Sequence, residues 1–242
     1  MKSDAKSVNL IDLGFNLVLG KFIERINRFM ILVEVDCGEV YAHLSNSGRL
    51  STALRPGDVT YLRRIERMVR RKSAYTIFAV RHDDVFVIID AQFSNFIARR
   101  AIELGLIEDL AGYTIVKENF SVNGSRLDFV LEKGLDKFYV EVKSVTHVVN
   151  GVALFPDAPT LRGKRHIRQL ASLSALGLRA GILFSVQRPD AIVVRPNSDV
   201  DPEFAVLLKE AVEAGVKVFT LKSSFQPPKT IVLEPNIPLF QL

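Results

Sequence analysis

The sequence contains one cysteine, no tryptophan and no long apolar segment. The single Cys37 has no internal disulfide partner, which is typical of proteins in a reducing compartment and excludes a zinc finger built on cysteine ligands. A membrane-spanning helix needs about 18–20 apolar residues in a row, and no segment approaches that length. Residues 1–10 carry charges before any apolar run and have no small-residue cleavage pattern, so they do not indicate a secretion signal. We therefore expect a cytoplasmic protein with no membrane partner.

Hydrophobic residues are abundant, and the positive charge is clustered. The chain has 242 residues, of which 48% are hydrophobic, enough for one or two packed domains. The formal net charge is only +5, but residues 63–72 hold six basic side chains against one acid, and residues 162–168 hold five if His166 is protonated. Either run alone is compatible with a solvated surface. Two such runs in one chain favour phosphate neutralisation, and hence a nucleic-acid partner.

Short strands and turns account for the first ninety residues. Turns are predicted at residues 36–38, 45–48 and 55–58, where glycine permits positive φ and proline presets the first turn position. Between and around them, the sequence predicts the strands Leu17–Ile26, Phe29–Val35, Glu39–His43, Val59–Arg64, Ala74–Arg81 and Val85–Asp90. Many short strands separated by turns favour a small barrel, and we expect a five-stranded OB-like β-barrel.

The pattern changes near residue 91 to a mixture of helices and strands. Ser94 is the expected N-terminal cap of a helix that runs to Leu104, and Gly105 is expected to end it. The predicted elements that follow are the strands Tyr113–Phe120, Arg126–Glu132 and Lys137–Val145, the helix Gly163–Ala175, the strands Ala180–Val186 and Ala191–Val194, the helix Pro202–Ala214 and the strand Lys217–Leu221.

The elements up to residue 186 have the order αβββαβ. We expect a mixed α+β chain of two domains, with residues 1–90 forming the barrel and residues 91–242 the αβββαβ domain. The tail 222–242 contains several prolines and an apolar end. It packs either on its own domain or on a partner, and the sequence leaves this choice open.

Three chemically reactive side chains fall on two of these strands. Side chains alternate along a strand, so Glu141 and Lys143 point to the same face, with Val140 and Val142 pointing into the core. A hairpin centred between residues 134 and 135 places Asp128 opposite Glu141. Cross-strand neighbours lie about 4.5–5.5 Å apart at Cβ, so the two carboxylates should meet beside an ammonium group.

Two carboxylates at that distance repel each other unless a cation lies between them. Mg²⁺ typically binds one or two carboxylates together with waters and substrate phosphate, and Mn²⁺ can replace it. A metal ion of this kind activates a water and stabilises charge on phosphoryl oxygens, and Lys143 can orient that water or neutralise the developing charge. The alternative is a surface ladder of Asp128, Glu141 and Lys143 with no chemistry.

An aspartate followed on the next strand by Glu-x-Lys resembles the PD-(D/E)xK nuclease superfamily, whose core has the same αβββαβ order. Longer segments resemble the sugar fermentation stimulation protein family (SfsA). They are SRLDF at 125–129, YVEVKSVT at 139–146, GVALFPDAPTLRGKRHIRQL at 151–170, RINRF at 25–29, AHLSNSGRL at 42–50, LRPG at 54–57, Asn95 and LGLI at 104–107. The resemblance extends from about residue 15 to residue 220.

This resemblance implies an N-terminal OB-like domain joined to a restriction-endonuclease-like domain, and DNA binding of low sequence specificity. It implies catalytic roles for Asp128, Glu141 and Lys143. The residues that it suggests as metal ligands are Asp128, Glu141, Glu118 and Asp157, although Asp157 can equally cap the approach to a helix near Thr160. The candidate nucleic-acid contacts are Arg63, Arg64, Arg70, Arg71, Arg126, Arg162, Lys164, Arg165 and His166.

Two alternatives concern single residues. Lys164 and Arg165 can be solvated instead of bound to phosphate. His147 follows the EVKSVT motif, where it is more often a surface histidine at a strand end than a contact to substrate or metal.

The leading hypothesis for function is a Mg²⁺- or Mn²⁺-dependent DNA phosphodiesterase that acts on double- or single-stranded DNA. The alternative is a non-catalytic DNA-binding regulator of sugar-metabolism genes that keeps the nuclease scaffold. An RNA-directed nuclease is a third hypothesis, because OB barrels also bind single-stranded RNA. Converging carboxylates favour the first hypothesis, since without a metal they would repel DNA. The oligomeric state is not predicted.

Overall fold

The N-terminal part of the chain forms a closed barrel. A computed structural model of the protein describes residues 9–66, 73–122 and 125–239. Its barrel strands are β2 (Leu17–Asn27), β3 (Met30–Val35), β4 (Gly38–His43), β5 (Val59–Arg64), β6 (Tyr75–His82) and β7 (Val85–Ile88). The strand order is β4-β3-β2-β5-β6-β7, and β4 also pairs with β6, which closes a ring of five strands. The expected OB-like barrel is therefore confirmed.

Glycine turns and alternating apolar side chains explain why this segment closes. Gly38 and Gly57 have φ angles of 110° and 95° at two of the predicted turns, a conformation that other residues rarely adopt. Along β3, Ile31, Val33 and Val35 are buried while their neighbours are more exposed. These side chains belong to a core that fills the barrel.

The C-terminal part is built on a seven-stranded sheet with the order β1-β16-β15-β13-β10-β9-β8. Its elements follow the predicted αβββαβ order. They are α1 (Phe93–Glu103), β8 (Thr114–Val122), β9 (Ser125–Lys133), β10 (Asp136–Val145), α2 (Leu161–Ala175) and β13 (Arg179–Val186). The prediction of Ser94 as helix cap is wrong, because α1 begins at Phe93 and its cap position is Gln92, two residues before Ser94. Ser94 is instead buried in the first turn, where its hydroxyl donates to the carbonyl of Ala91 at 2.6 Å.

The remaining segments extend this domain. A small sheet with the order β11-β12-β14 lies beside the large sheet. The further elements are η1 (Glu108–Leu110), β11 (Val148–Val149), β12 (Val152–Phe155), β14 (Val193–Pro196), α3 (Pro202–Glu213), β15 (Lys217–Gln226) and β16 (Thr230–Pro235). As far as residue 239 the tail packs on its own chain, because β16 pairs with β15 and Leu239 forms a bridge with Val194.

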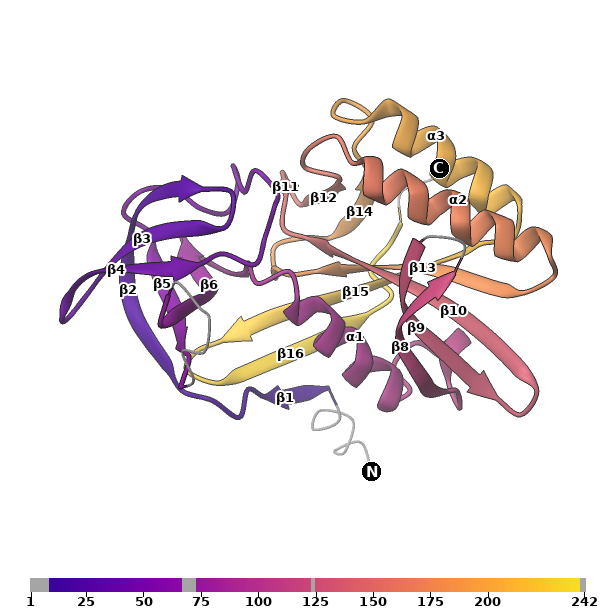
Figure 1. Cartoon of the computed structure of the whole chain (residues 1–242), viewed down its shortest axis with the longest axis horizontal. Helices are drawn as coiled ribbons and strands as arrows, with labels where there is room; N and C mark the ends of the chain where they lie inside the picture. The colour runs from indigo at the N-terminus through magenta and orange to yellow at the C-terminus, as the bar shows by residue number, and fades with distance from the viewer. Residues whose placement is uncertain (1–8, 67–72, 123–124, 240–242) are drawn as a thin grey trace.

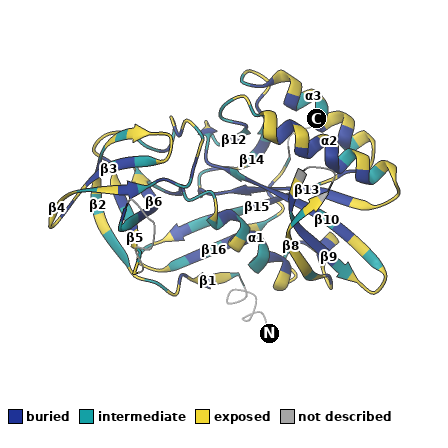
Figure 2. Ribbon diagram, viewed as in Figure 1, coloured by how far each residue is buried: buried dark blue, intermediate teal, exposed yellow. Residues whose placement is uncertain are grey.

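Helices cover both faces of the seven-stranded sheet (Figure 1). The core on one face includes Ile97 and Ala101 of α1, and the core on the other includes Ile167 of α2 and Phe204 and Leu208 of α3. The central strands β10 and β13 are buried along most of their length (Figure 2). No helix in the described part of the chain is both long enough and apolar enough to cross a membrane.

The barrel and the sheet domain share part of one core. The ring of Phe78 in the barrel packs edge-on against Phe225 of β15, with 5.3 Å between centroids, and against Phe93 of α1 at 5.0 Å. The first strand, β1 (Leu10–Asp12), lies within the predicted barrel unit 1–90 but pairs with β16 of the large sheet. Domains that share an apolar core of this kind move little relative to each other, so a site between them has fixed walls.

Candidate metal and nucleic-acid site

The register of one hairpin brings Asp128 next to Glu141. Strands β9 and β10 pair from Lys133 and Asp136 to Phe129 and Val140, which makes Asp128 and Glu141 the next positions in register. Past Phe129 and Val140, where the paired register ends, the side chain of Asp128 provides the contact to β10. Its Oδ2 accepts a hydrogen bond from the backbone N–H of Val142 at 2.8 Å, and its Oδ1 accepts one from Asn95 of α1 at 2.8 Å.

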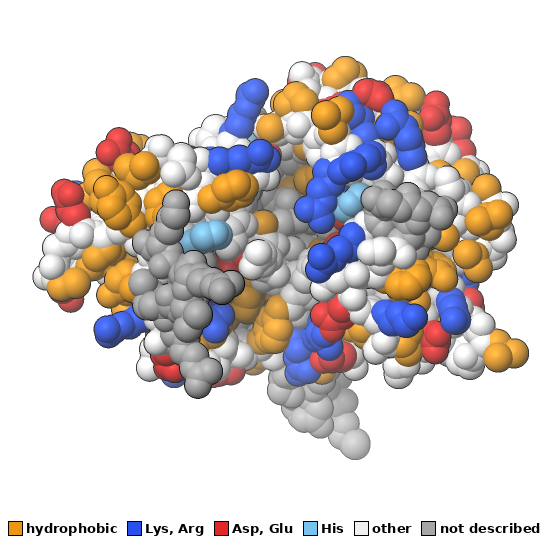
Figure 3. Space-filling model, in the orientation of Figure 1, with side chains coloured by type: hydrophobic (Ala, Val, Ile, Leu, Met, Phe, Trp, Pro, Cys, Tyr) orange, Lys and Arg blue, Asp and Glu red, His pale blue; other side chains and the backbone are white. Residues whose placement is uncertain are grey.

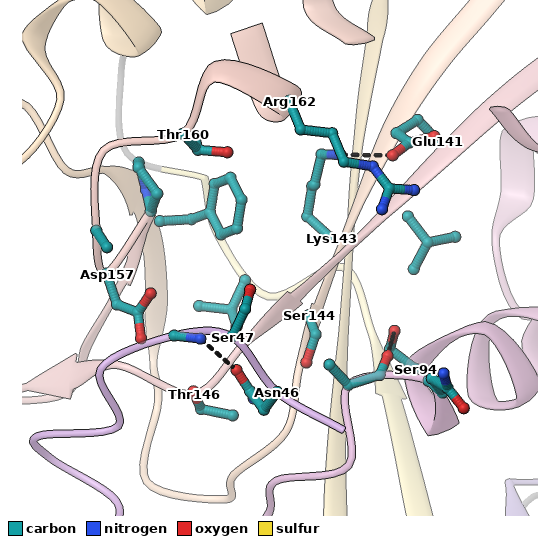
Figure 4. A pocket seen from close by; sticks show the side chains of 18 of the residues that line it. Asn46, Ser47, Ser94, Glu141, Lys143, Ser144, Thr146, Asp157, Thr160 and Arg162 are labelled. Carbon is teal, nitrogen blue, oxygen red and sulfur yellow. Dashed lines mark hydrogen bonds and ion pairs between the residues drawn. The ribbon is translucent and has the colours of Figure 1, made fainter. Parts of the chain in front are cut away.

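Glu141 and Lys143 share a face of β10, as the alternation of the strand predicts. The ammonium nitrogen of Lys143 lies 2.5 Å from Oε1 of Glu141 (Figure 4). Helix α2 adds His166, whose Nδ1 contacts the same carboxylate oxygen and lies 3.0 Å from the Lys143 nitrogen. All three side chains are buried, so this is an internal charged cluster and not a solvated ladder.

Burial and neighbouring charges shift the titration of this cluster. Burial and, after it, the Glu141 charge together raise the pKa of Asp128 to about 6, against the opposing effects of the Val142 N–H, Lys143 and Asn95. Burial also raises the pKa of Glu141, but Lys143 and His166 together outweigh it and leave this pKa lowered. Burial lowers the pKa of His166, despite its contact with Glu141. Near neutral pH, Glu141 is therefore ionised and His166 is neutral.

One oxygen of the cluster has no partner. Glu141 Oε2 is buried and makes no hydrogen bond with any residue that the structure describes. A buried carboxylate oxygen without a partner is costly, and an oxygen-preferring divalent cation would satisfy it. No group of three or more His, Cys, Asp or Glu side chains that could hold a metal occurs in the described residues. Two carboxylates, Asp128 and Glu141, are therefore the side chains that could hold an ion here, with water or substrate as its other ligands.

The two further acids suggested as metal ligands have other partners. Glu118 lines the same cleft but forms an ion pair with Arg99 of α1. Asp157 lies across the cleft, where its Oδ2 accepts a 3.4 Å hydrogen bond from the backbone N–H of Leu50 in the barrel. A Cβ atom at Gly48 would lie 2.3 Å from the same Asp157 oxygen. Asp157 therefore joins the two domains, and neither it nor Glu118 is grouped with Asp128 and Glu141.

The carboxylates line a cleft of about 750 Å³ between the barrel and the sheet domain. Loop residues 46–48 of the barrel form one wall, and β9, β10 and the 155–160 loop form the others (Figure 4). Lys and Arg side chains lie on both sides of the hollow between the domains (Figure 3). The cleft is therefore both polar and positively rimmed, as a binding site for a polyanion requires.

Hydrogen bonds fix the barrel wall of the cleft. Arg25 donates to the backbone carbonyls of Gly48 at 2.7 Å and Asn46 at 3.0 Å. Arg188 of the sheet domain donates to the carbonyl of Thr52 at 2.6 Å, and His147 Nδ1 lies 3.3 Å from the Thr52 hydroxyl. His147 is thus a half-buried contact between the domains, and it also lines the cleft.

The predicted basic residues divide into several groups. Arg126 and Arg162 line the cleft, while Arg165 is exposed on α2 and is not part of the lining. Arg63 and Arg64 are exposed on β5, also outside the lining, and the predicted contacts Arg70 and Arg71 lie outside the described residues.

The prediction that Lys164 contacts phosphate is wrong. Lys164 is buried against α3, where its ammonium lies 2.6 Å from Glu203 and 3.5 Å from Asp201. His166 also points inward, to Glu141. Neither side chain is part of the cleft lining.

Sequence reasoning missed several residues of the cleft. Arg28, Asn46 and Asn119 line it, and Asn95 orients Asp128. Of these, Asn95 and the segments around Arg28 and Asn46 fall in the motifs that carry the family resemblance. The family motifs could therefore have pointed to these residues, although the motifs alone assign no role to them.

Comparison with known proteins agrees with this architecture. The model of the SfsA N-terminal OB domain matches residues 23–89, and the model of the sugar fermentation stimulation protein RE domain matches residues 92–229. A sugar fermentation stimulation protein homolog from Moorella thermoacetica is 37% identical over 93% of this chain and 98% of its own. One from Methanothermobacter thermautotrophicus is 39% identical over 84% of both chains.

A solved structure shares the whole fold. The SfsA structure from Pyrococcus furiosus superimposes with a TM-score of 0.89 at 30% identity, covering 96% of this chain and all of the other. Sequence, domain models and fold thus agree along nearly the full length, and the chain belongs to the sugar fermentation stimulation protein family.

Proposed function

We propose that this protein is a divalent-metal-dependent phosphodiesterase that cleaves DNA with low sequence specificity. The observation that carries the proposal is the buried, unpartnered Oε2 of Glu141 beside Asp128 and Lys143, in a cleft that Arg126 and Arg162 line. A protein that only binds DNA gains nothing from two carboxylates facing a polyanion.

The cation proposed here is Mg²⁺ or Mn²⁺, held by Asp128 and Glu141. The Pyrococcus furiosus relative was solved in complex with Ca²⁺, which supports a site for a hard divalent cation in the family. When bound, such an ion lowers the pKa of a water and stabilises charge on phosphoryl oxygens.

The chain's own residues provide the positioning. Asn95 and the Val142 N–H hold the Asp128 carboxylate in one orientation. Lys143, fixed by Glu141, offers a cation to the charge that develops on the phosphate. Arg126 and Arg162 bind neighbouring phosphates at the cleft wall and hold the strand in register with the carboxylates.

The test is cleavage of single- and double-stranded DNA with Mg²⁺ or Mn²⁺, run beside a binding titration. Wild type should cleave, and Glu141→Gln should bind DNA without cleaving it, because this change keeps the side-chain shape and removes the charge. Glu118→Gln is the matched control, since Glu118 lines the same cleft with a different partner, and it should keep most activity. Binding by all three proteins, without cleavage under either metal, would overturn the proposal.

A second candidate is a non-catalytic DNA-binding regulator, and one observation favours it. Lys143 contacts Oε1 of Glu141, so its ammonium balances the carboxylate charge without any metal ion. In that case DNA affinity should be the same with and without a chelator, and Glu141→Gln should leave it unchanged.

A further inference from the structure

We propose that the substrate enters as a single strand and that Arg28 and Phe29, at the tip of the β2–β3 hairpin, form a base-stacking site beside the cleft. This inference rests on the proposed function, because it names the form of polynucleotide that reaches Asp128 and Glu141. DNA and RNA strands present the same stacking chemistry, so the test includes both.

The hairpin tip is held in one conformation. The side chain of Asn27 accepts a hydrogen bond from the backbone N–H of Phe29 at 2.9 Å, and the carbonyl of Phe29 accepts one from Leu44 at 2.9 Å. Arg25 donates to the carbonyl of Arg28 at 2.8 Å and also to the loop at 46–48. The same guanidinium therefore ties the tip to the barrel wall of the cleft.

The two side chains at this tip are available to a ligand. Phe29 is 48% exposed, although single exposed apolar residues are common and alone mean little. Here the guanidinium carbon of Arg28 lies 5.4 Å from the centroid of the Phe29 ring, and Arg28 itself lines the cleft. An aromatic ring paired with an arginine, next to a phosphate-binding groove, is the combination on which unpaired bases stack.

The size and rigidity of the cleft favour one strand over two. A volume of about 750 Å³ lies in the range that encloses one drug-sized ligand, roughly 300–1,000 Å³. This is the scale of a small ligand or a short stretch of one strand, not of a base-paired duplex. The walls cannot separate easily, because Phe78, Phe93 and Phe225 pack together across the domain boundary. Both features favour a single strand over a duplex as the form that reaches Glu141.

The experiment is a fluorescence anisotropy titration in chelator, so that no cleavage occurs, with labelled single-stranded DNA, single-stranded RNA and duplex DNA of equal length. Wild type should bind one or both single strands more tightly than the duplex. Phe29→Ala should weaken single-strand binding about tenfold, in line with the loss of one stacked base, and Phe29→Tyr should restore it. Leu135→Ala is the matched control, because Leu135 is a fully exposed apolar residue near the tip of another hairpin. The Leu135→Ala protein should bind the single strands as tightly as wild type does.

Unchanged binding of both single strands by Phe29→Ala would overturn the inference, and so would a duplex bound at least as tightly as both single strands. Thermal unfolding of each variant shows whether it is folded, and Phe29→Tyr controls for any general effect of changing the tip. The assay needs no metal, so its outcome is separate from that of the cleavage assay. A protein that stacks bases at Phe29 but never cleaves would retain this inference and lose the proposed function.

Discussion

The ammonium nitrogen of Lys143 lies 2.5 Å from Oε1 of Glu141, two positions earlier on β10. The other oxygen of that carboxylate is buried without a partner among the described residues. The lysine thus neutralises a buried charge and leaves the second carboxylate oxygen without a hydrogen bond to any described residue. This asymmetry makes the pair useful for testing both stability and metal binding.

Replacing Lys143 with methionine should destabilise the protein. The change leaves the ionised Glu141 buried with only His166 beside it, and breaking a buried ion pair from one side costs about 3–5 kcal/mol. The free energy of unfolding, measured by urea denaturation in chelator, should fall by an amount of that order. Adding Glu141→Gln to the same chain should recover part of the loss, because no charge is then left unpaired. A Lys143→Met protein as stable as wild type would show that the pair contributes nothing.

Divalent metal should stabilise the folded protein through Asp128 and Glu141. A ligand at 100 times its Kd adds about 2.7 kcal/mol to the stability of the state that binds it. The Tm of wild type should therefore rise by several degrees in saturating Mn²⁺ or Mg²⁺. Asp128→Asn and Glu141→Gln should each remove most of that rise, and Glu118→Gln should keep it. A rise of equal size in all four proteins would place the metal elsewhere.

Asp90 should make the protein less stable as the pH rises from 5 to 7. Burial raises the pKa of this carboxyl from its ordinary value of 3.8 to about 6, against the opposing effect of backbone N–H groups at the start of α1. A raised carboxyl pKa means that the folded state holds the proton more tightly. The stabilisation is therefore complete below about pH 3.8 and is lost as the pH passes 6.

Between pH 5 and 7 the loss should be about 1 kcal/mol. It can be measured as the difference in unfolding free energy between wild type and Asp90→Asn, since the amide cannot titrate. If the unfolding free energies of the two proteins changed with pH in the same way across this range, Asp90 would not be the titrating group.

Local patterns were sufficient to predict the hairpin that carries the carboxylates. The register that places Asp128 opposite Glu141 follows from the short loop near Gly134 and from the alternation of Val140 with Glu141. The barrel strands were predictable for the same reason, since each turn signal and each apolar pattern involves only neighbouring residues. Tertiary packing only shifted the ends of these elements by a few residues, as with the start of α1.

Contacts between distant segments could not be predicted from such patterns. The partners of Lys164 are Asp201 and Glu203, which only the packing of α2 on α3 reveals. Likewise, Asp157 has the chemistry of a metal ligand, and its role as a link to the barrel depends on the approach of Gly48 and Leu50. A charged side chain indicates what it can bind, but only the fold determines what it meets.

The first turn of α2 offers a direct comparison of a lysine inside the protein with an arginine at the cleft. Arg162 lines the cleft, and Lys164, two residues later, is buried against α3. Arg162→Ala should weaken binding of single-stranded DNA and reduce the slope of log affinity against log salt by about 0.7, the value for one phosphate contact on a single strand. Lys164→Met should leave both quantities unchanged and lower the Tm, because Asp201 and Glu203 lose their cation. A lower salt slope for Lys164→Met would instead mean that Lys164 leaves its partners to bind the strand.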